Sequence, residues 1–327
     1  MASSDGSRTG PRVVVVVPTL GAPHVVRAVQ SALQQTYRDV AVVVSVDGPA
    51  PGELAAALPD EPRLRIIESD RRRGPRAARA AAIDAAAGAD YIAFLDDDDR
   101  WHPEKIRRQV AAAEAAKAEL AGNVVVLCRM NLVDSDGRFI QTVPRRVLRP
   151  GERLADYLFV RREIRPGETT VAASMMLLSR DAAQRARATS ATHLHEDWET
   201  LLLLAADPST AVLMLDQVLL DYTVAAAGDS ASSRAGWRLS RDWFEGQRAG
   251  LTPREHGDGL LCVTGVLAVA QRDWRGAGRI ARSVLAERSA GWRAWVFFLA
   301  SVMLPARLRR ALTRGAAALR RVSSRRR

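Results

Sequence analysis

Four consecutive aspartates, Asp96 to Asp99, are the residues of this chain best suited to chemistry. They directly follow the apolar run Tyr91–Leu95, whose short and unpatterned sequence is typical of a strand buried on both faces. Adjacent carboxylates repel one another unless a cation lies between them, and a divalent cation with a diphosphate meets that need. The pattern therefore predicts a metal and phosphate site. The alternative is an acidic, solvent-exposed turn before the helix that Pro103 begins.

The elements around these aspartates alternate between strands and helices, which predicts βαβ units and a parallel sheet. The predicted strands cover residues 12–17, 40–46, 64–67 and 91–95, and the predicted helices cover residues 24–34, 74–87 and 103–120. Each strand ends at a polar residue: Thr19, Asp47, Ser69 and Asp96. In open parallel sheets, ligands bind at the carboxyl ends of the strands, so these side chains are expected to share one edge.

The later part of the chain changes character. The pattern predicts further strands at residues 123–131, 171–179, 210–215 and 218–224, with a hairpin turn at residues 134–137. Beyond residue 225 it predicts only helices, at residues 230–249, 255–271, 274–287, 290–303 and 306–322. We therefore expect a flexible N-terminus (1–11), an α/β domain (12–227), a helical region (228–305) and a basic tail (306–327).

The net charge of +11 is concentrated at one end of the chain. Nine arginines and no acidic residue occur from Arg307 onward, so the rest of the chain is close to neutral. Because no nucleic-acid-binding motif accompanies the tail, no specific nucleic acid is expected. The segment Gly291–Leu299 is rich in aromatic residues and precedes the arginines, as in interfacial anchors on anionic lipid. An ordinary packed helix with a solvated basic end is the alternative.

Neither targeting nor disulfide formation is indicated. Cys128 and Cys262 each lie in an apolar segment, which predicts buried, reduced thiols. The N-terminus lacks the order of a secretory signal, and no apolar run reaches the roughly 20 residues that cross a bilayer. We expect a cytoplasmic protein, located at the inner face of the cell membrane if the tail binds lipid.

Five motifs in order resemble those of the family-2 glycosyltransferases, which have the GT-A fold. They are Val13–Leu20, Val44–Gly48, Arg73–Arg79, Phe94–Pro103 and His195–Asp197. The resemblance covers about residues 12 to 225. It implies a GT-A, Rossmann-like fold with a mostly parallel sheet flanked by helices, followed here by an all-helical C-terminal region. The chain departs from the family pattern at Ala80 and Ala82, where the family often has Asn and Gly.

The resemblance implies a nucleotide pocket at the start of the domain. By that likeness, Pro18 and Thr19 line the base pocket, and Asp47 hydrogen-bonds the edge of the nucleobase. A carboxylate suits this role because it accepts from a ring N–H; an Asx-type turn with Gly48 is the alternative for Asp47. Arg79 is expected to approach the nucleotide or its phosphates.

The same resemblance identifies the aspartate run as an Asp-x-Asp motif. Asp96 is expected to reach the ribose or the metal, Asp97 to belong to the nucleotide site, and Asp98 to bind Mg²⁺ or Mn²⁺ bridging the diphosphate. Carboxylate and phosphate oxygens suit those hard cations. Asp99 is predicted to cap the next helix, and Trp101 to pack beneath the motif.

Asp197 is the predicted general base. Glycosyl transfer with inversion needs a carboxylate that takes the proton of the acceptor hydroxyl, and aspartates are ordinarily ionised at neutral pH. The alternative is an acid that is favoured at the N-terminus of a helix by the helix dipole. Glu196 is expected to orient the acceptor, and His193 and His195 to line its pocket. A zinc site at His193 and His195 lacks a third ligand nearby in sequence.

Together these features predict a metal-dependent, inverting glycosyltransferase. It would move a sugar from a nucleotide-sugar donor, with a UDP-sugar as the family's tendency, to a hydroxyl of a saccharide or lipid-linked acceptor in cell envelope polysaccharide. One alternative is a catalytically decayed, membrane-associated scaffold or binding protein. Another is a sugar nucleotidylyltransferase, for which the Gly-rich signature after the first strand is missing. Acceptor specificity is expected in loops such as Gln141–Pro166 and Gly228–Trp237.

Overall fold

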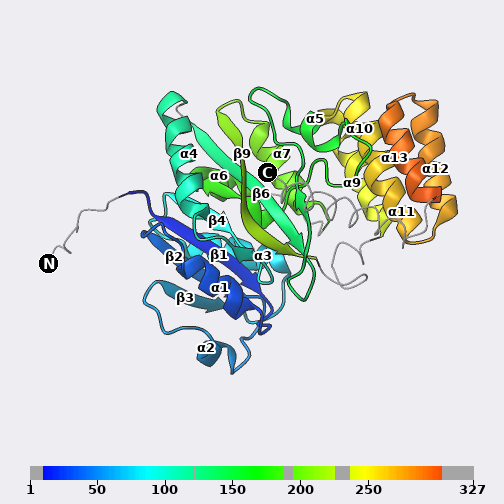
Figure 1. Ribbon diagram of the computed structural model, residues 1–327. Helices are drawn as coiled ribbons and strands as arrows, with labels where there is room; N and C mark the ends of the chain where they lie inside the picture. The colour runs from blue at the N-terminus through cyan, green and yellow to red at the C-terminus, as the bar shows by residue number, and fades with distance from the viewer. Residues whose placement is uncertain (1–9, 121, 188–193, 225–235, 304–327) are drawn as a thin grey trace, which may run out of the picture. The chain divides into compact units, whose positions relative to one another are not determined.

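The computed structural model describes residues 10–120, 122–187, 194–224 and 236–303 of the chain (Figure 1). It divides into two compact units. The first is made of Met1–Met130, Val171–Thr189 and Thr200–Thr223, and the second of Asn131–Thr170, Ser190–Glu199 and Val224–Arg327. Each unit thus combines segments that are distant in sequence. The domain boundaries expected at 227/228 and 305/306 remain predictions.

Half of the sheet consists of parallel strands, in the order β3-β2-β1-β4. These strands are β1 (Val13–Thr19), β2 (Val40–Val46), β3 (Leu64–Glu68) and β4 (Tyr91–Phe94). Every residue of β1 and of β4 is buried, because each strand has neighbours on both sides and helices over its faces. This burial explains why both strands are uninterrupted apolar runs in the sequence.

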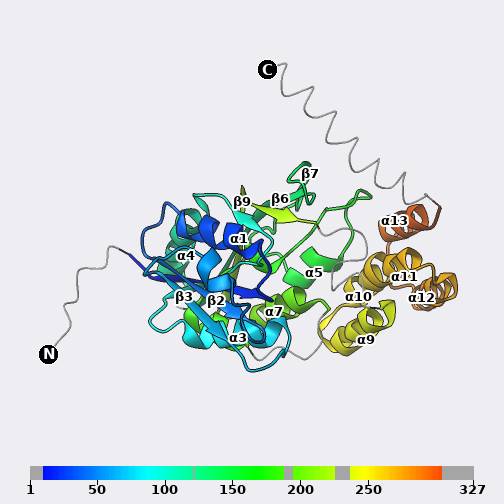
Figure 2. The same cartoon turned by 90° about the horizontal axis from the view of Figure 1, so that it is seen from below.

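Two crossover helices cover the parallel half. Helix α1 (Val25–Leu33) connects β1 to β2, and α3 (Pro75–Ala85) connects β3 to β4. The two connections run in opposite directions across the sheet, so right-handed crossovers place the helices on opposite faces, as Figure 2 shows. Gly74 precedes α3 with φ of 95°, a conformation that glycine adopts without strain, and Pro75 occupies the first turn. The short α2 (Leu54–Ala57) lies between β2 and β3.

The other half of the sheet contains antiparallel pairs. Strand β8 (Leu177–Ser179) pairs antiparallel with β4 and with β6 (Asn123–Val133), and β9 (Thr210–Thr223) pairs antiparallel with β5 (Arg100–Trp101). The full order is β3-β2-β1-β4-β8-β6-β9-β5, with β7 (Phe139–Val143) paired to β6. The predicted α/β sheet with flanking helices is confirmed, and the structure shows it to be mixed.

Two details of the antiparallel half differ from the sequence prediction. Residues 171–179, predicted as one strand, form the 3₁₀ turn η1 (Ala173–Met175) followed by the three-residue β8. Residues 210–215 and 218–224, predicted as two strands, form the single strand β9, in which Asp216 and Gln217 are exposed. The polar pair suggested a turn, but it is simply a solvent-facing stretch of a continuous strand. Helices α4 (Lys105–Glu119) and α6 (Arg180–Ala186) complete the first unit.

The second unit is mainly helical. It contains α5 (Leu154–Phe159), the first turn of α7 (Glu196–Ala205), α9 (Trp237–Gln247), η2 (Arg248–Gly250), α10 (Pro253–Gly259), the π-helix η3 (Leu260–Gly265), α11 (Val266–Ala270), α12 (Trp274–Ala286) and α13 (Trp292–Met303). Segment η3 contacts each of α9 to α13 and is the centre of this array. The helix predicted at residues 306–322 and most of the predicted acceptor loop Gly228–Trp237 lie outside the described residues.

Local sequence explains where these helices begin and how closely they pack. The Thr252 hydroxyl accepts the backbone N–H of Glu255, and the Glu255 carboxylate accepts the backbone N–H of Thr252. This reciprocal cap starts α10. A Cβ on Gly259 would come within 2.4 Å of the Phe244 ring, so the glycine permits α9 and α10 to approach. Within the described residues, no helix is both long enough and apolar enough to span a bilayer.

Both cysteines are free, as predicted. Burial raises the pKa of the Cys128 thiol to about 11 and that of the Cys262 thiol to about 12. The thiols are therefore protonated and unreactive at neutral pH.

Candidate active site

The carboxyl ends of β1 and β4 meet where the strand order changes direction, which is the place where open α/β sheets bind ligands. Thr19 ends β1 and follows the buried Pro18, and Asp97 comes shortly after β4. The Thr19 hydroxyl donates to Asp97 Oδ2 over 2.5 Å, and His24 Nε2 lies 3.3 Å from Asp97 Oδ1. Residues 78 positions apart in sequence are thus brought together at one sheet edge. His24 was not singled out from the sequence.

Asp47 fixes a loop at the same edge. Its backbone N–H donates to the Thr19 carbonyl over 2.9 Å. Its two carboxylate oxygens accept the backbone N–H groups of Arg73 and Gly74, at 2.7 and 2.9 Å. The carboxylate therefore bonds the start of α3 and does not form the local Asx-type turn that the sequence left open. A carboxylate oxygen can accept more than one hydrogen bond, so this arrangement leaves acceptor capacity for a ligand.

Arg79 reaches the aspartate run from α3. Its Nη2 lies 3.3 Å from Asp96 Oδ1, and its guanidinium lies over the Phe94 ring, 5.3 Å from the ring centroid. The Asp96 backbone N–H donates to the Ser174 hydroxyl over 2.9 Å. Burial raises the pKa of Asp96, although Arg79 opposes the shift. Two residues that were predicted separately for the nucleotide site, Arg79 and Asp96, are therefore in contact.

Asp98 is partly buried and has like charges beside it. Burial, with the charges of Asp96 and Asp97, raises the pKa of Asp98 to about 6. A bound divalent cation would offset this repulsion, and carboxylate oxygens are suitable ligands for Mg²⁺ or Mn²⁺. Among the described residues, no group of three or more His, Cys, Asp or Glu side chains is arranged to hold a metal. The donor set fits a cation that takes its remaining ligands from phosphate and water.

Asp99 has a different role from the predicted helix cap. Its side chain is buried and accepts the backbone N–H of Thr223 over 3.0 Å, while the Thr223 hydroxyl donates to the Asp98 carbonyl over 2.6 Å. The residue that precedes α4 is Glu104. Asp99 thus ties the aspartate run to the end of β9, and the prediction of a cap was wrong. Burial and the neighbouring carboxylates raise the pKa of Asp99 well above its ordinary value.

Trp101 is buried beneath the aspartate run, as predicted. Its indole N–H donates to the Ser174 carbonyl over 3.1 Å, and its backbone N–H donates to the Ser31 hydroxyl over 3.1 Å. The fully buried Lys105 ammonium lies 4.0 Å from the centroid of the Trp101 ring. These contacts fix the chain on the C-terminal side of the carboxylates.

Asp197 belongs to the second unit and lies in the first turn of α7. His195 is the residue immediately before α7 and adopts φ of 68°. The His195 carbonyl accepts the Glu199 N–H over 2.9 Å. The His195 ring stacks on Trp198, with centroids 4.4 Å apart and planes inclined by 4°. His195 Nε2 lies 2.9 Å from the Ser240 hydroxyl. That His195 lines the acceptor pocket stays a prediction, and His193 lies outside the described residues.

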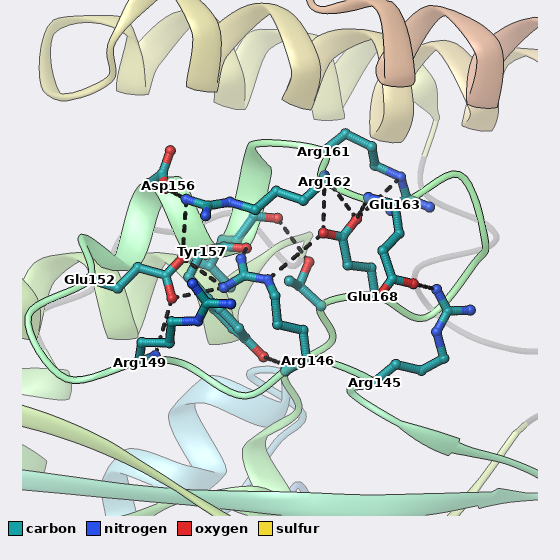
Figure 3. Close-up of polar contacts among 12 residues, drawn as sticks. Arg145, Arg146, Arg149, Glu152, Asp156, Tyr157, Arg161, Arg162, Glu163 and Glu168 are labelled. Atoms are coloured by element: carbon teal, nitrogen blue, oxygen red, sulfur yellow. Dashed lines mark hydrogen bonds and ion pairs between the residues drawn. The ribbon is translucent and has the colours of Figure 1, made fainter.

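One of the loops expected to select the acceptor is held by an arginine-rich network, drawn in Figure 3. Glu168, which is 1% exposed, accepts the backbone N–H groups of Arg162 and Glu163. Nε of Arg146 and Nε of Arg161 each lie 3.8 Å from its carboxylate. One buried acid therefore fixes both ends of the segment from Arg146 to Glu163. No local sequence pattern indicates this role of Glu168.

Comparisons with known proteins agree with the fold and with the motifs. The family model described as "Glycosyl transferase family 2" matches residues 14–186. The succinoglycan biosynthesis protein ExoO of Rhizobium meliloti is 43% identical over 129 residues, which are 39% of this chain and 35% of that protein. The amylovoran biosynthesis glycosyltransferase AmsB of Erwinia amylovora is 24% identical over 247 residues, or 74% of this chain and 79% of that protein.

Two further matches have names that specify a nucleotide sugar. The Escherichia coli protein WfgD, a UDP-Glc:alpha-D-GlcNAc-diphosphoundecaprenol beta-1,3-glucosyltransferase, is 30% identical over 101 residues, covering 30% of this chain and 40% of that protein. The crystal structure of S. aureus TarS 1-349 in complex with UDP-GlcNAc superposes with a TM-score of 0.53 at 16% identity. The superposition covers 94% of this chain and 87% of the TarS chain, and at 16% identity the likeness shows the fold alone.

Proposed function

Since the chain belongs to glycosyl transferase family 2, we propose that it transfers a sugar from a nucleoside diphosphate to a hydroxyl group of a saccharide or lipid-linked acceptor. The observation that carries the proposal is the junction of Thr19 and Asp97, where the ends of β1 and β4 meet inside the family-matched region. This edge carries the polar groups and clustered carboxylates that a nucleotide diphosphate and its cation require.

The proposed donor is a UDP-sugar. The name of WfgD specifies UDP-Glc, and the TarS structure is a complex with UDP-GlcNAc. These nucleotide sugars are the ligands of those two proteins, and we extend the donor class to this chain as a proposal. In this chain Pro18 and Thr19 would line the base pocket, and Asp47 would accept from the uracil ring N–H. Arg79 would contact the phosphates. Asp96 and Asp97 would contribute to the nucleotide site on the side of the ribose.

Asp98, with Asp96, is the proposed holder of Mg²⁺ or Mn²⁺. When bound, such a cation stabilises negative charge on the departing diphosphate. The raised pKa of Asp98 supports this assignment, because a carboxylate destabilised by its neighbours gains from a nearby cation. Arg79 would contribute a fixed positive charge beside Asp96, at the same edge of the sheet.

Asp197 is the proposed general base of an inverting displacement. Its carboxylate would accept the proton of the acceptor hydroxyl as that oxygen attacks the sugar from the face opposite the leaving group. The position of Asp197 in the first turn of α7, after the tightly held His195, supports a fixed orientation. Glu196, its neighbour, is the candidate for orienting the acceptor.

The proposed acceptor belongs to cell envelope polysaccharide and is carried on a lipid. The names of ExoO and AmsB refer to succinoglycan biosynthesis and amylovoran biosynthesis, and that of WfgD specifies alpha-D-GlcNAc-diphosphoundecaprenol. A lipid-linked acceptor would be met at a membrane surface, so we also propose peripheral contact of the basic C-terminal tail with anionic lipid at the inner face of the membrane.

Calorimetric titration with UDP, GDP and dTDP, with and without Mn²⁺, tests the donor site. Metal-dependent binding of one nucleotide should be lost in Asp98→Ala. Asp216→Ala is the matched control, because Asp216 is an aspartate of the same unit whose side chain is 72% exposed. If none of the three nucleotides binds, the aspartate run is structural, and the alternative of a catalytically decayed scaffold replaces the transferase.

A further inference from the structure

Helix α13 presents an apolar stripe to solvent. Trp292, Val296, Leu299 and Met303 are 59%, 39%, 49% and 79% exposed. Their spacing of four, three and four residues places them on one face of the helix. Single exposed apolar residues are common on protein surfaces, but a contiguous apolar face indicates a site that binds a partner.

The rest of the second unit holds α13 by its opposite face. Ala294 and Phe298 are buried, and the Cys262 thiol donates to the Ala294 carbonyl over 3.7 Å. The Arg161 guanidinium lies 3.8 Å from the centroid of the Phe297 ring. The exposed stripe is therefore not needed for packing within the unit, and it remains available to a partner.

Charge decides which partner fits. Arg293 lies over the Trp292 ring, with its guanidinium 4.4 Å from the ring centroid. The 24 residues that follow Met303 contain nine arginines and no acid. Two copies of this chain joined through the stripe would bring like charges together, whereas an anionic surface would attract them. An apolar face with adjoining arginines matches the boundary between headgroups and acyl chains of an anionic bilayer.

We propose that the α13 stripe docks in the interface of an anionic bilayer, with the helix lying in the membrane plane. Trp292 would lie at the level of the headgroups, where indole rings are favoured, and Val296, Leu299 and Met303 would enter the acyl boundary. This proposal rests on the membrane contact proposed above and assigns its apolar part to one face of the folded helix α13. It does not depend on sugar transfer, because lipid binding can be measured alone.

The test measures co-sedimentation of the full chain with vesicles of phosphatidylcholine and phosphatidylglycerol, compared with phosphatidylcholine alone. Val296→Asp combined with Leu299→Asp should weaken partitioning by about tenfold or more, since two buried apolar contacts become charged. Leu239→Asp is the control: Leu239 is 52% exposed on α9, and Figure 2 shows α9 and α13 on opposite sides of α10 and α11. Circular dichroism checks that each variant is folded.

A further variant replaces the nine tail arginines with glutamine and separates charge from apolar insertion. The proposal predicts that it loses the preference for phosphatidylglycerol, while the double aspartate variant loses binding to the mixed vesicles themselves. Unchanged binding of the double variant overturns the proposal, with the tail alone as the lipid site. Concentration-dependent dimerisation that the double variant abolishes also overturns it, because a second copy then covers the stripe.

Discussion

The imidazole of His195 lies 2.9 Å from the Ser240 hydroxyl, and the Ser240 hydroxyl lies 2.7 Å from that of Thr264. This polar chain joins the π-helix η3 and α9 to the residue that precedes α7. Because the His195 carbonyl accepts the Glu199 N–H, the chain fixes the turn that carries Asp197. Segments of π-helix occur often at functional sites, which agrees with a positioning role here.

Ser240→Ala should therefore lower kcat about tenfold while changing KM for the donor by less than about twofold, since it loosens the turn that carries the proposed base. Donor hydrolysis by water is a readout that needs no known acceptor. Phe159→Leu is the control: Phe159 packs on Trp198 and Trp243 in the same cluster without a ring contact to His195. Equal losses of kcat in both variants would indicate packing alone, and Ser240→Thr, which keeps a hydroxyl, should restore part of the activity.

The buried His195 also gives a pH prediction for stability. Burial lowers the pKa of His195 to about 4, below the value of about 6.5 in an unfolded chain. The unfolded state therefore binds the proton first, so the contribution is fully present above pH ~6.5 and is lost as the pH falls toward about 4. The difference amounts to roughly 3 kcal/mol at the acid end. His195→Asn, which tolerates positive φ, should flatten this slope in urea unfolding between the two pH values.

Asp197→Asn tests the proposed base directly. The amide cannot accept the proton, so turnover should fall by about a hundredfold or more, the usual contribution of general base catalysis. Donor affinity should stay within a few-fold, as measured by titration with UDP. Asp216→Asn controls for the loss of a charge at an exposed site. Near-normal turnover of Asp197→Asn refutes Asp197 as the base without affecting the donor site.

The first βαβ units could be predicted from sequence to within a few residues. In β1, Val13 to Val17 are buried between neighbouring strands and helices, so no polar residue interrupts the pattern. By contrast, β5 has two residues and depends on pairing with β9, which no local pattern encodes. In β9 itself, the exposed Asp216 suggested a break between two strands, because a solvent-facing stretch of one strand and a turn are both polar in sequence.

The site was predictable only as far as local motifs reach. The aspartate run was evident because it follows a buried strand, and Thr19 because it ends one. Ser174 and Thr223 were missed, since they bond Asp96 and Asp99 across 78 and 124 positions. A lone serine or threonine in a loop gives no signal of such a partner, and the partner is defined only once the sheet is assembled.

Asp98 predicts a pH limit for metal-dependent donor binding. With its pKa raised to about 6, the carboxyl takes up a proton as the pH falls through that value, and the proton competes with the cation. Affinity for UDP with Mn²⁺ should decline below pH ~6, and Asp97→Asn should move the midpoint to lower pH because one repelling charge is removed. Titration calorimetry across this range checks the shift; a midpoint unmoved by Asp97→Asn contradicts the assigned cause.

The hydrogen bonds of Asp47 predict a stability effect at the carboxyl edge of the sheet. Asp47→Asn leaves one oxygen for the N–H groups of Arg73 and Gly74, and it turns an amide NH₂ toward the other donor. The loss should be about 1–3 kcal/mol in the free energy of unfolding, the cost of a buried donor without an acceptor. Asp60→Asn, at an exposed loop position, should cost much less. Equal stability of the two variants in urea unfolding would mean that the loop before α3 does not depend on the Asp47 carboxylate.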